Sequence, residues 1–217
     1  MNKYLERANE IIPELVENRR HFHRHPELRD ELFETVKYVR AKLEEMGYEV
    51  NEICQCGLVA LAGGKKPGKC ILIRGDMDAL PMPEETGLPF SSENPGAMHA
   101  CGHDFHMAML LGAAKILKEH EDEIEGTVKI CFQPNEETFG GAKAMIDAGV
   151  LENPHVDVAL AIHVGPVAEV GTLDYGKGLT MGSADGFSIH VKGKGCHGAA
   201  PNRGISPINI GDRKSVV

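Results

Sequence analysis

The sequence predicts an α/β fold, with a mostly parallel mixed sheet flanked by helices. Strand-like apolar runs alternate with helical patterns over the first 162 residues, and such alternation is typical of parallel sheets. The run at 70–73 is continuous in apolar residues, as in strands that are covered on both faces. Three buried-type runs end in acidic or histidine side chains. Because ligands bind beyond the carboxyl ends of parallel strands, this edge of the sheet is the predicted site.

The first predicted elements are two helices. Over 3–22, apolar side chains recur at a spacing near 3.6 residues, which indicates an amphipathic helix. A second helix covers 31–46, and Gly47 is placed as its C-terminal stop. The His-x-His-x-His run at 21–25 invites a metal site. We interpret it as a hydrogen-bonded turn, because Pro26 ends the helix and no carboxylate or thiol has ligand spacing nearby.

Short strands and helices then follow in alternation. The first two strands form a paired β-unit, and the later ones are of the buried type. The predicted strands cover 48–53, 58–62, 70–73, 128–132 and 156–162, and the predicted helices among them cover 107–118 and 140–149.

Polar side chains follow three of these strands. One polar strand end is unremarkable, since polar residues end many strands. Three ends that converge with a Cys-x-His at a helix start indicate a site. The converging residues are Asp76 and Asp78 after 70–73, Glu136 and Glu137 after 128–132, and His163 after 156–162.

The stretch from Met98 to His106 holds one thiol, three imidazoles and a carboxylate. These are ligand types that a borderline-soft divalent metal prefers. The stretch leads into the helix at 107–118, and a helix N-terminus favours a thiolate over a thiol at Cys101. Cys101 alone would be interpreted as a free cysteine, whereas Cys-Gly-His-Asp-x-His as a unit favours a metal site.

Composition limits the classes of partner. Lys and Arg number 23 against 32 Asp and Glu, and the net charge of −9 argues against nucleic acid or an anionic membrane. No run reaches the roughly 18 apolar residues of a membrane helix, and the N-terminus has no apolar signal-peptide core. We therefore expect a cytoplasmic protein.

In a reducing compartment the six scattered cysteines favour metal binding or packing over disulfides, and Cys70 and Cys131 are expected in the core.

A change of character after Gly171 predicts a second domain. Several glycines loosen the chain, and then 187–193 alternates apolar and polar residues, as a half-exposed antiparallel strand does. The boundary is placed near Met181 to Ala184. The predicted divisions are 1–182 as the metal-binding domain, 183–210 as the start of a smaller domain, and 211–217 as a non-native tail.

Five motifs occur in an order that resembles a known family. They are Arg-Gly-Asp-Met-Asp-Ala-Leu-Pro (74–81), Met-His-Ala-Cys-Gly-His-Asp-x-His (98–106), Gln-Pro-x-Glu-Glu (133–137), Ala-Ile-His-Val-Gly-Pro (161–166) and Gly-x-His-Gly-Ala-x-Pro (195–201). From about residue 10 to 210, the chain resembles the N-terminal part of an M20-family metallopeptidase. It is most similar to the amidohydrolase branch: hippurate hydrolases, N-acyl-amino-acid amidohydrolases and auxin-conjugate hydrolases.

The resemblance implies a zinc-peptidase-like catalytic domain, followed by the start of an α+β lid or dimerisation domain. It implies two divalent ions (Zn, Mn, Co or Ni), cleavage of N-acyl amino acids, and a homodimer or homotetramer. The implied metal ligands are Cys101, which bridges the two ions, and His103, Glu137 and His163. Glu136 would be the general base, and the carboxylate of Asp78 would orient a metal-bound imidazole. His197 would polarise the scissile carbonyl in the active site of a partner subunit.

Other readings stay open beside this one. The chain could belong to a non-catalytic metal- or substrate-binding protein, or to a dipeptidase or deacetylase of the same family. Glu136 favours an enzyme, since a structural site has no use for an unligated glutamate, and the lack of paired Cys-x-x-Cys units argues against a structural metal domain. Family members extend well beyond this length and carry a last metal histidine there. We therefore expect an inactive fragment with a non-native tail at 211–217, in which 212–217 matches a translated sequencing adapter.

Overall fold

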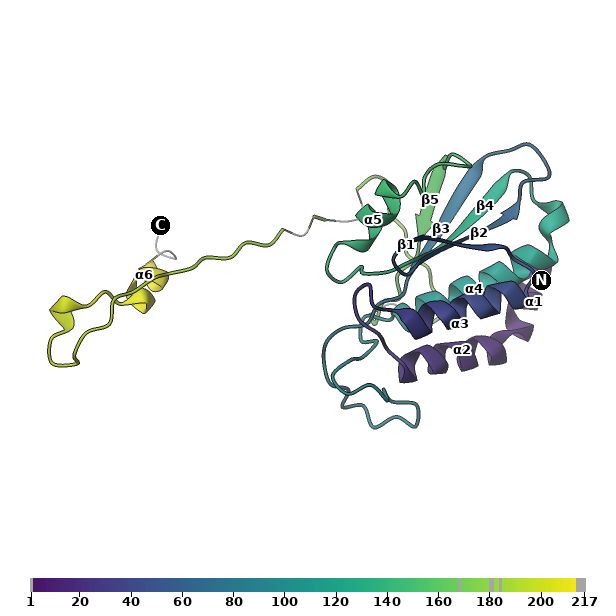
Figure 1. Cartoon of the computed structure of the whole chain (residues 1–217). Coiled ribbons are helices and arrows are strands. Elements are labelled where there is room, and N and C mark those ends of the chain that lie inside the picture. The colour runs from purple at the N-terminus through teal and green to yellow at the C-terminus, as the bar shows by residue number, and fades with distance from the viewer. Residues whose placement is uncertain (1, 168, 180–181, 184, 214–217) are drawn as a thin grey trace. The chain divides into compact units, whose positions relative to one another are not determined.

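The computed structural model describes residues 2–167, 169–179, 182–183 and 185–213 (Figure 1). The chain divides into two compact units, Met1–Pro166 and Val167–Val217. The predicted boundary near Met181 to Ala184 includes two residues, 181 and 184, outside the described ones, and it stays a prediction.

A five-stranded sheet forms the centre of the first unit. Its strand order is β1-β2-β4-β3-β5. The pairings β1–β2 and β2–β4 are antiparallel, whereas β3 pairs in parallel with both β4 and β5. The sheet is therefore mixed, and the predicted α/β fold with flanking helices is confirmed. The strands are β1 (Val50–Cys54), β2 (Gly57–Gly63), β3 (Cys70–Asp76), β4 (Thr127–Gln133) and β5 (Val158–Ala161).

The three parallel strands end at one edge of the sheet. In the register of β3 and β4, Asp76 lies opposite Gln133, and in that of β3 and β5, Arg74 lies opposite Ala161. The polar residues that follow these strands are therefore brought to the same edge, as the sequence predicts.

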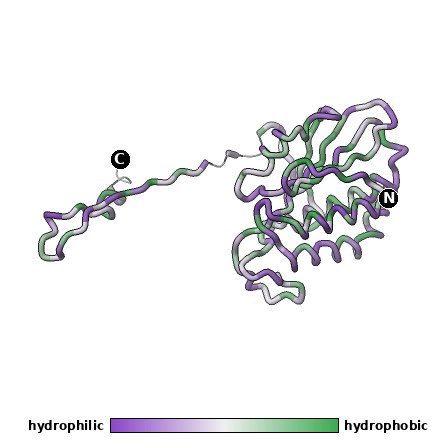
Figure 2. The backbone as a smooth tube through the Cα atoms, in the orientation of Figure 1, coloured by the Kyte–Doolittle hydropathy of each residue, from purple (hydrophilic) through white to green (hydrophobic). Residues whose placement is uncertain are grey.

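Helices cover both faces of the sheet. On one face, α3 and α4 pack on the strands, and α2 packs outside α4 (Figure 1). On the other face, α5 lies against β1 and β4. In Figure 2, hydrophilic and hydrophobic residues alternate along these helices, as expected for one-sided burial. The helices of this unit are α1 (Lys3–Glu10), α2 (Ile12–Arg24), α3 (Phe33–Glu45), α4 (His103–Glu119), the short 3₁₀ turn η1 (Glu121–Glu123) and α5 (Gly141–Asp147).

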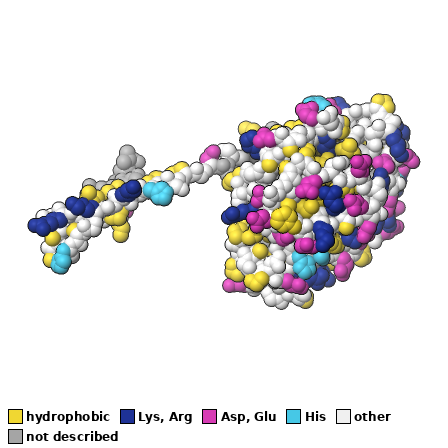
Figure 3. All heavy atoms as spheres, viewed as in Figure 1, with side chains coloured by type: hydrophobic (Ala, Val, Ile, Leu, Met, Phe, Trp, Pro, Cys, Tyr) yellow, Lys and Arg dark blue, Asp and Glu magenta, His cyan; other side chains and the backbone are white. Residues whose placement is uncertain are grey.

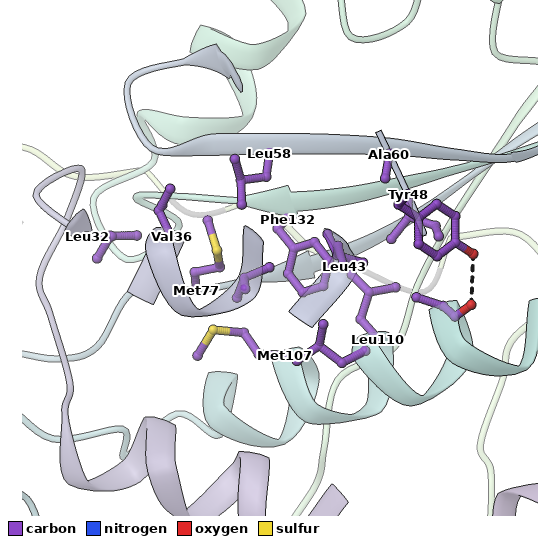
Figure 4. Packing of buried hydrophobic residues seen from close by; sticks show 14 of the residues in the cluster. Leu32, Val36, Leu43, Tyr48, Leu58, Ala60, Met77, Met107, Leu110 and Phe132 are labelled. Atoms are coloured by element: carbon purple, nitrogen blue, oxygen red, sulfur yellow. Dashed lines mark hydrogen bonds between the residues drawn. The ribbon is translucent and has the colours of Figure 1, made fainter. Parts of the chain in front are cut away.

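The main core lies between the sheet and helices α3 and α4. Leu58 and Phe132 from the strands meet Leu43 and Leu110 from the helices, and all four side chains are buried (Figure 4). A smaller cluster on the opposite face includes Leu72 and Cys131 with Met145 of α5. As predicted, Cys70 and Cys131 are buried, and all six cysteines are free thiols.

The predicted helix at 3–22 is in fact two helices. The first ends at Glu10, and the second begins at Ile12 with Pro13 in its first turn. Proline is tolerated there because the first N–H groups of a helix have no partner in the helix.

The histidines at 21 and 23 lie in the last turn of α2, so the separate turn expected at 21–25 is wrong. Gly47 follows α3 with a positive φ of 86°, as predicted for a helix stop.

Two strand predictions need correction. The run 156–162 was expected to be covered on both faces, but β5 is an edge strand, in which Val158 and Leu160 are each 49% exposed. The strand expected at 187–193 does not form. Strands need a partner for their backbone groups, and no described segment pairs with 187–193; an isolated bridge joins Lys194 and Ile205 instead.

The second unit contains little regular structure among its described residues. It has the 3₁₀ turn η2 (Pro201–Arg203) and the helix α6 (Pro207–Arg213). Several of its apolar side chains are exposed, including Phe187 at 87%.

Among the described residues of the whole chain, no helix is long and apolar enough to cross a membrane. Acidic and basic side chains are interspersed on the face of the first unit in Figure 3, without a continuous basic stripe there.

Candidate metal centre

Four predicted ligands and the predicted base come together at the carboxyl edge of the sheet. One group of possible ligand atoms comprises Cys101, His103 and His163, and another comprises His103, Glu136 and Glu137. Within each group the ligand atoms lie within 4.8 Å of one another. The two groups share His103, so together they outline one continuous centre.

Gly102 sets the start of α4 between Cys101 and His103. It caps the helix with a φ of 98°, a left-handed conformation that L side chains rarely adopt. A Cβ at this position would also lie 2.4 Å from Cγ2 of Val164, which is a clash. Both observations favour glycine at this position, and its two chain neighbours, Cys101 and His103, offer ligand atoms to the same group.

His103 is oriented for metal binding. Its Nδ1–H donates to the carbonyl oxygen of Asp78 at 2.7 Å, and the residue is fully buried. The other ring nitrogen, Nε2, has no hydrogen-bond partner among the described residues. It lies 3.8 Å from Oε2 of Glu136 and 3.9 Å from Oε1 of Glu137. A buried lone pair aimed at carboxylates suits a bound cation, since an imidazole ligand commonly donates its other nitrogen to a carbonyl.

The ring of His163 is held in the same way as that of His103, with Nδ1 bound to a backbone carbonyl and Nε2 facing the centre. Its Nδ1–H donates to the carbonyl oxygen of Val164 at 2.8 Å. Its Nε2 faces the Sγ atom of Cys101 at 3.4 Å. Both imidazoles therefore present Nε2 to the centre and fix the tautomer through a backbone carbonyl.

Asp78 holds the glutamate pair in place. Its two carboxylate oxygens accept the backbone N–H groups of Glu136 and Glu137, at 2.9 and 3.1 Å. Its expected task was to orient an imidazole, and here its carbonyl oxygen makes the short contact to His103. The Glu137 side chain is 19% exposed and that of Glu136 36%, so Glu136 is the more accessible of the two carboxylates.

The backbone around the glutamates is irregular. Asn135 and Phe139 both have positive φ, at 51° and 63°. Such conformations are unfavourable for residues with a side chain and gather at functional sites. Phe139 is also 75% exposed beside the centre, which sequence reasoning did not anticipate.

The charges of the centre favour a cation. Burial and the nearby carboxylates, Glu137 foremost, raise the pKa of the Cys101 thiol to about 12. Burial likewise raises the pKa of the Glu137 carboxyl. The expected thiolate at the helix N-terminus is therefore not favoured by the protein alone, because burial and acidic neighbours outweigh the helix dipole. A divalent cation among these groups reverses that balance, since coordination deprotonates a thiol.

Two residues to which the sequence assigned no role also lie here. Asp76 and His106 form a third group of possible ligands with His103. Both ring nitrogens of His106 are already engaged, since Nδ1–H donates to Oδ1 of Asp76 and Nε2 accepts the backbone N–H of Val164. His106 is therefore not free to bind a metal. The signal for both residues was present in the motifs, because Asp76 and His106 lie within them.

His197 belongs to the second unit. Its side chain is exposed, and its Nδ1 accepts the backbone N–H of Ala199 at 3.2 Å. Its predicted contact with a partner subunit stays a prediction.

Residues 72–209 match the profile of peptidase family M20/M25/M40. The chain is 42% identical over 205 residues to N-acetyl-L-cysteine deacetylase of Bacillus subtilis, covering 94% of this chain and 49% of that protein. It is 42% identical over 206 residues to N-acyl-L-amino acid amidohydrolase of Geobacillus stearothermophilus, covering 94% and 55%. The chain thus spans about half the length of these curated relatives.

A solved structure shares the fold. A dinuclear metal-binding peptidase of the M20 family from Bacillus subtilis superposes with a TM-score of 0.68 and 43% sequence identity. The match covers 71% of this chain and 43% of that protein.

Proposed function

The chain belongs to peptidase family M20/M25/M40, and from this we propose that it supplies the metal-binding half of an amidohydrolase that cleaves the amide bond of N-acyl amino acids. The resemblance of the five motifs to this family is confirmed. Two relatives of this chain support the proposal by their names, N-acetyl-L-cysteine deacetylase and N-acyl-L-amino acid amidohydrolase.

One observation carries the proposal. The unpartnered Nε2 of buried His103 lies among the thiol of Cys101 and the carboxylates of Glu136 and Glu137. We propose that Cys101, His103, Glu137 and His163 hold two divalent ions, with Cys101 as the bridge. Thiol, imidazole and carboxylate donors together suit Zn, Mn, Co or Ni.

The residues divide the chemistry of amide hydrolysis. When bound, the ions would supply an activated water and polarise the amide carbonyl at neutral pH. Glu136 takes the proton from the attacking water and delivers it to the leaving amine, which a carboxylate outside the ligand set can do. Asp78 keeps the two glutamates in these separate roles by holding their backbone N–H groups. His197 of a partner subunit would complete the site by polarising the scissile carbonyl.

The test is a metal analysis of the full-length protein, followed by assays on a panel of N-acyl amino acids that includes N-acetylcysteine. We expect two equivalents of metal and turnover that a chelator abolishes. Metal binding without turnover of any member of the panel would favour the alternative, a non-catalytic metal- or substrate-binding protein.

We propose a catalytic metal-binding domain at 1–182, the start of a lid or dimerisation domain at 183–210, and a non-native tail at 211–217. The full-length protein would be a cytoplasmic homodimer or homotetramer. Long-read sequencing of the locus tests the tail, because an intact gene that ends at Val217 would contradict it.

We expect the 217-residue chain, expressed alone, to be poorly soluble or partly unfolded and to lack amidase activity. The exposed edge of β5, with Val158 and Leu160 half exposed, can pair with other chains. Exposed apolar residues of the second unit, such as Phe187, add to this tendency. The measurement is the soluble fraction and an amidase assay. A soluble preparation with chelator-sensitive hydrolysis of an N-acyl amino acid would contradict the prediction.

A further inference from the structure

The segment that carries His163 has little support of its own. His163 is exposed and lies two residues beyond β5, which is itself an exposed edge strand. A metal ligand must be held in one orientation, and its supporting hydrogen bonds normally do this. The supports of His163 therefore have to come from its neighbour Val164 and from the residues that Val164 contacts.

Val164 is fixed by α4 through two contacts. Its backbone N–H donates to Nε2 of His106 at 3.1 Å, and its side chain packs against Gly102, the N-cap of α4. The carbonyl oxygen of Val164 in turn accepts the Nδ1–H of His163. Val164 thus connects two imidazoles, one buried in the helix and one exposed at the metal centre.

His106 is itself rigidly placed. It is 4% exposed, and its Nδ1–H donates to Oδ1 of Asp76, at the end of β3. Arg74 forms an ion pair with the other oxygen of Asp76 at 2.8 Å. Because Nε2 accepts an N–H group, it carries no proton, and the proton of the ring stays on Nδ1. Two hydrogen bonds of His106 therefore connect Asp76, at the end of β3, to Val164.

We propose that His106 is a positioning residue of the metal centre: its Nε2 holds the peptide group between His163 and Val164, and this hydrogen bond aims Nε2 of His163 at Cys101. The ring centroids of His106 and His163 lie 4.5 Å apart at 78°, so the buried ring also limits where the exposed ring can turn. The inference rests on the proposed function in one respect, since it takes His163 as a metal ligand.

Two variants of the full-length protein separate the two hydrogen bonds of His106. His106→Gln keeps an acceptor near the position of Nε2 and loses the donor to Asp76. His106→Asn keeps a donor near the position of Nδ1 and loses the acceptor for Val164. His120→Asn, a change at a partly buried histidine at the C-cap of α4, serves as the matched control.

The first readout needs no metal and no turnover. In chelated wild-type protein, NMR should detect scalar coupling across the N–H···N hydrogen bond between Val164 and His106. The Val164 amide should exchange with solvent faster in His106→Asn than in His106→Gln or the control. The second readout is metal affinity, measured by competition with a chelator. We expect His106→Asn to bind about 10- to 100-fold more weakly, the usual effect of removing such a support, and His106→Gln to stay close to wild type.

Three results would overturn the proposal: no coupling in the folded wild-type protein, wild-type metal affinity in His106→Asn, or equal losses in the two variants. An outcome in which the coupling is present and His106→Asn binds metal weakly, while no N-acyl amino acid is hydrolysed, would support the positioning role and count against the amidohydrolase. Failure of the inference and failure of the proposed function are thus distinguishable.

Discussion

Cys101→Ala and His103→Ala, each made in the full-length protein, are expected to lose bound metal and with it all amidase activity. His103 belongs to both ligand groups of the centre, and Cys101 is the proposed bridge between the two ions. Removing either one deprives the bound ions of a donor atom, so the remaining ligands hold metal weakly. Elemental analysis of the purified variants, after dialysis against a weak chelator, measures the loss.

Matched controls separate ligand loss from general damage. Cys196→Ala removes an exposed free cysteine of the second unit, and His120→Ala removes a partly buried histidine at the C-cap of α4. Both should keep the wild-type metal content. If Cys101→Ala or His103→Ala also kept full metal stoichiometry, the ligand assignment would be wrong. Circular dichroism should show the same helix content in all four variants, because the main core lies between α3, α4 and the sheet.

The place of the centre followed from the sequence, whereas its internal contacts did not. Parallel strands end at the same edge, so the residues after 70–73 and 128–132 had to meet there, and Cys101 could be placed by its position before a helix. The roles of Asp78 and His106 depend on hydrogen bonds to backbone groups of Glu136 and Val164. Such contacts join segments far apart in the chain and leave no periodic signal in the sequence.

Two of the wrong strand predictions have a common cause, because they depend on which other segments pack against the strand or pair with it. The apolar composition of 156–162 predicted a strand covered on both faces, but β5 lies at the edge of the sheet and all four of its residues are exposed. The alternation at 187–193 predicted a strand, but no described segment pairs with it. By contrast, the break at Pro13 could have been predicted, since proline commonly opens a helix and rarely continues one.

Glu136→Gln is expected to keep its metal and to lose turnover by about 100-fold or more, the usual scale for a group that transfers a proton. The amide has nearly the shape of the carboxylate, and the backbone N–H of residue 136 still donates to Asp78, so the local fold should remain. An amide cannot accept the proton of the attacking water, and this step is therefore lost.

The adjacent residue supplies the matched comparison. Glu137→Gln changes the same chemical group one position along the chain, beside the same anchor at Asp78. Glu137 is the more buried of the two, and its Oε1 has no hydrogen-bond partner, as expected for a ligand atom. Glu137→Gln should therefore lower metal content as well as turnover, whereas Glu136→Gln lowers turnover alone. Steady-state kcat and metal stoichiometry, measured on the same preparations, distinguish the two roles. A near-normal kcat in Glu136→Gln would remove Glu136 from the mechanism, and metal loss in both variants would make both glutamates ligands.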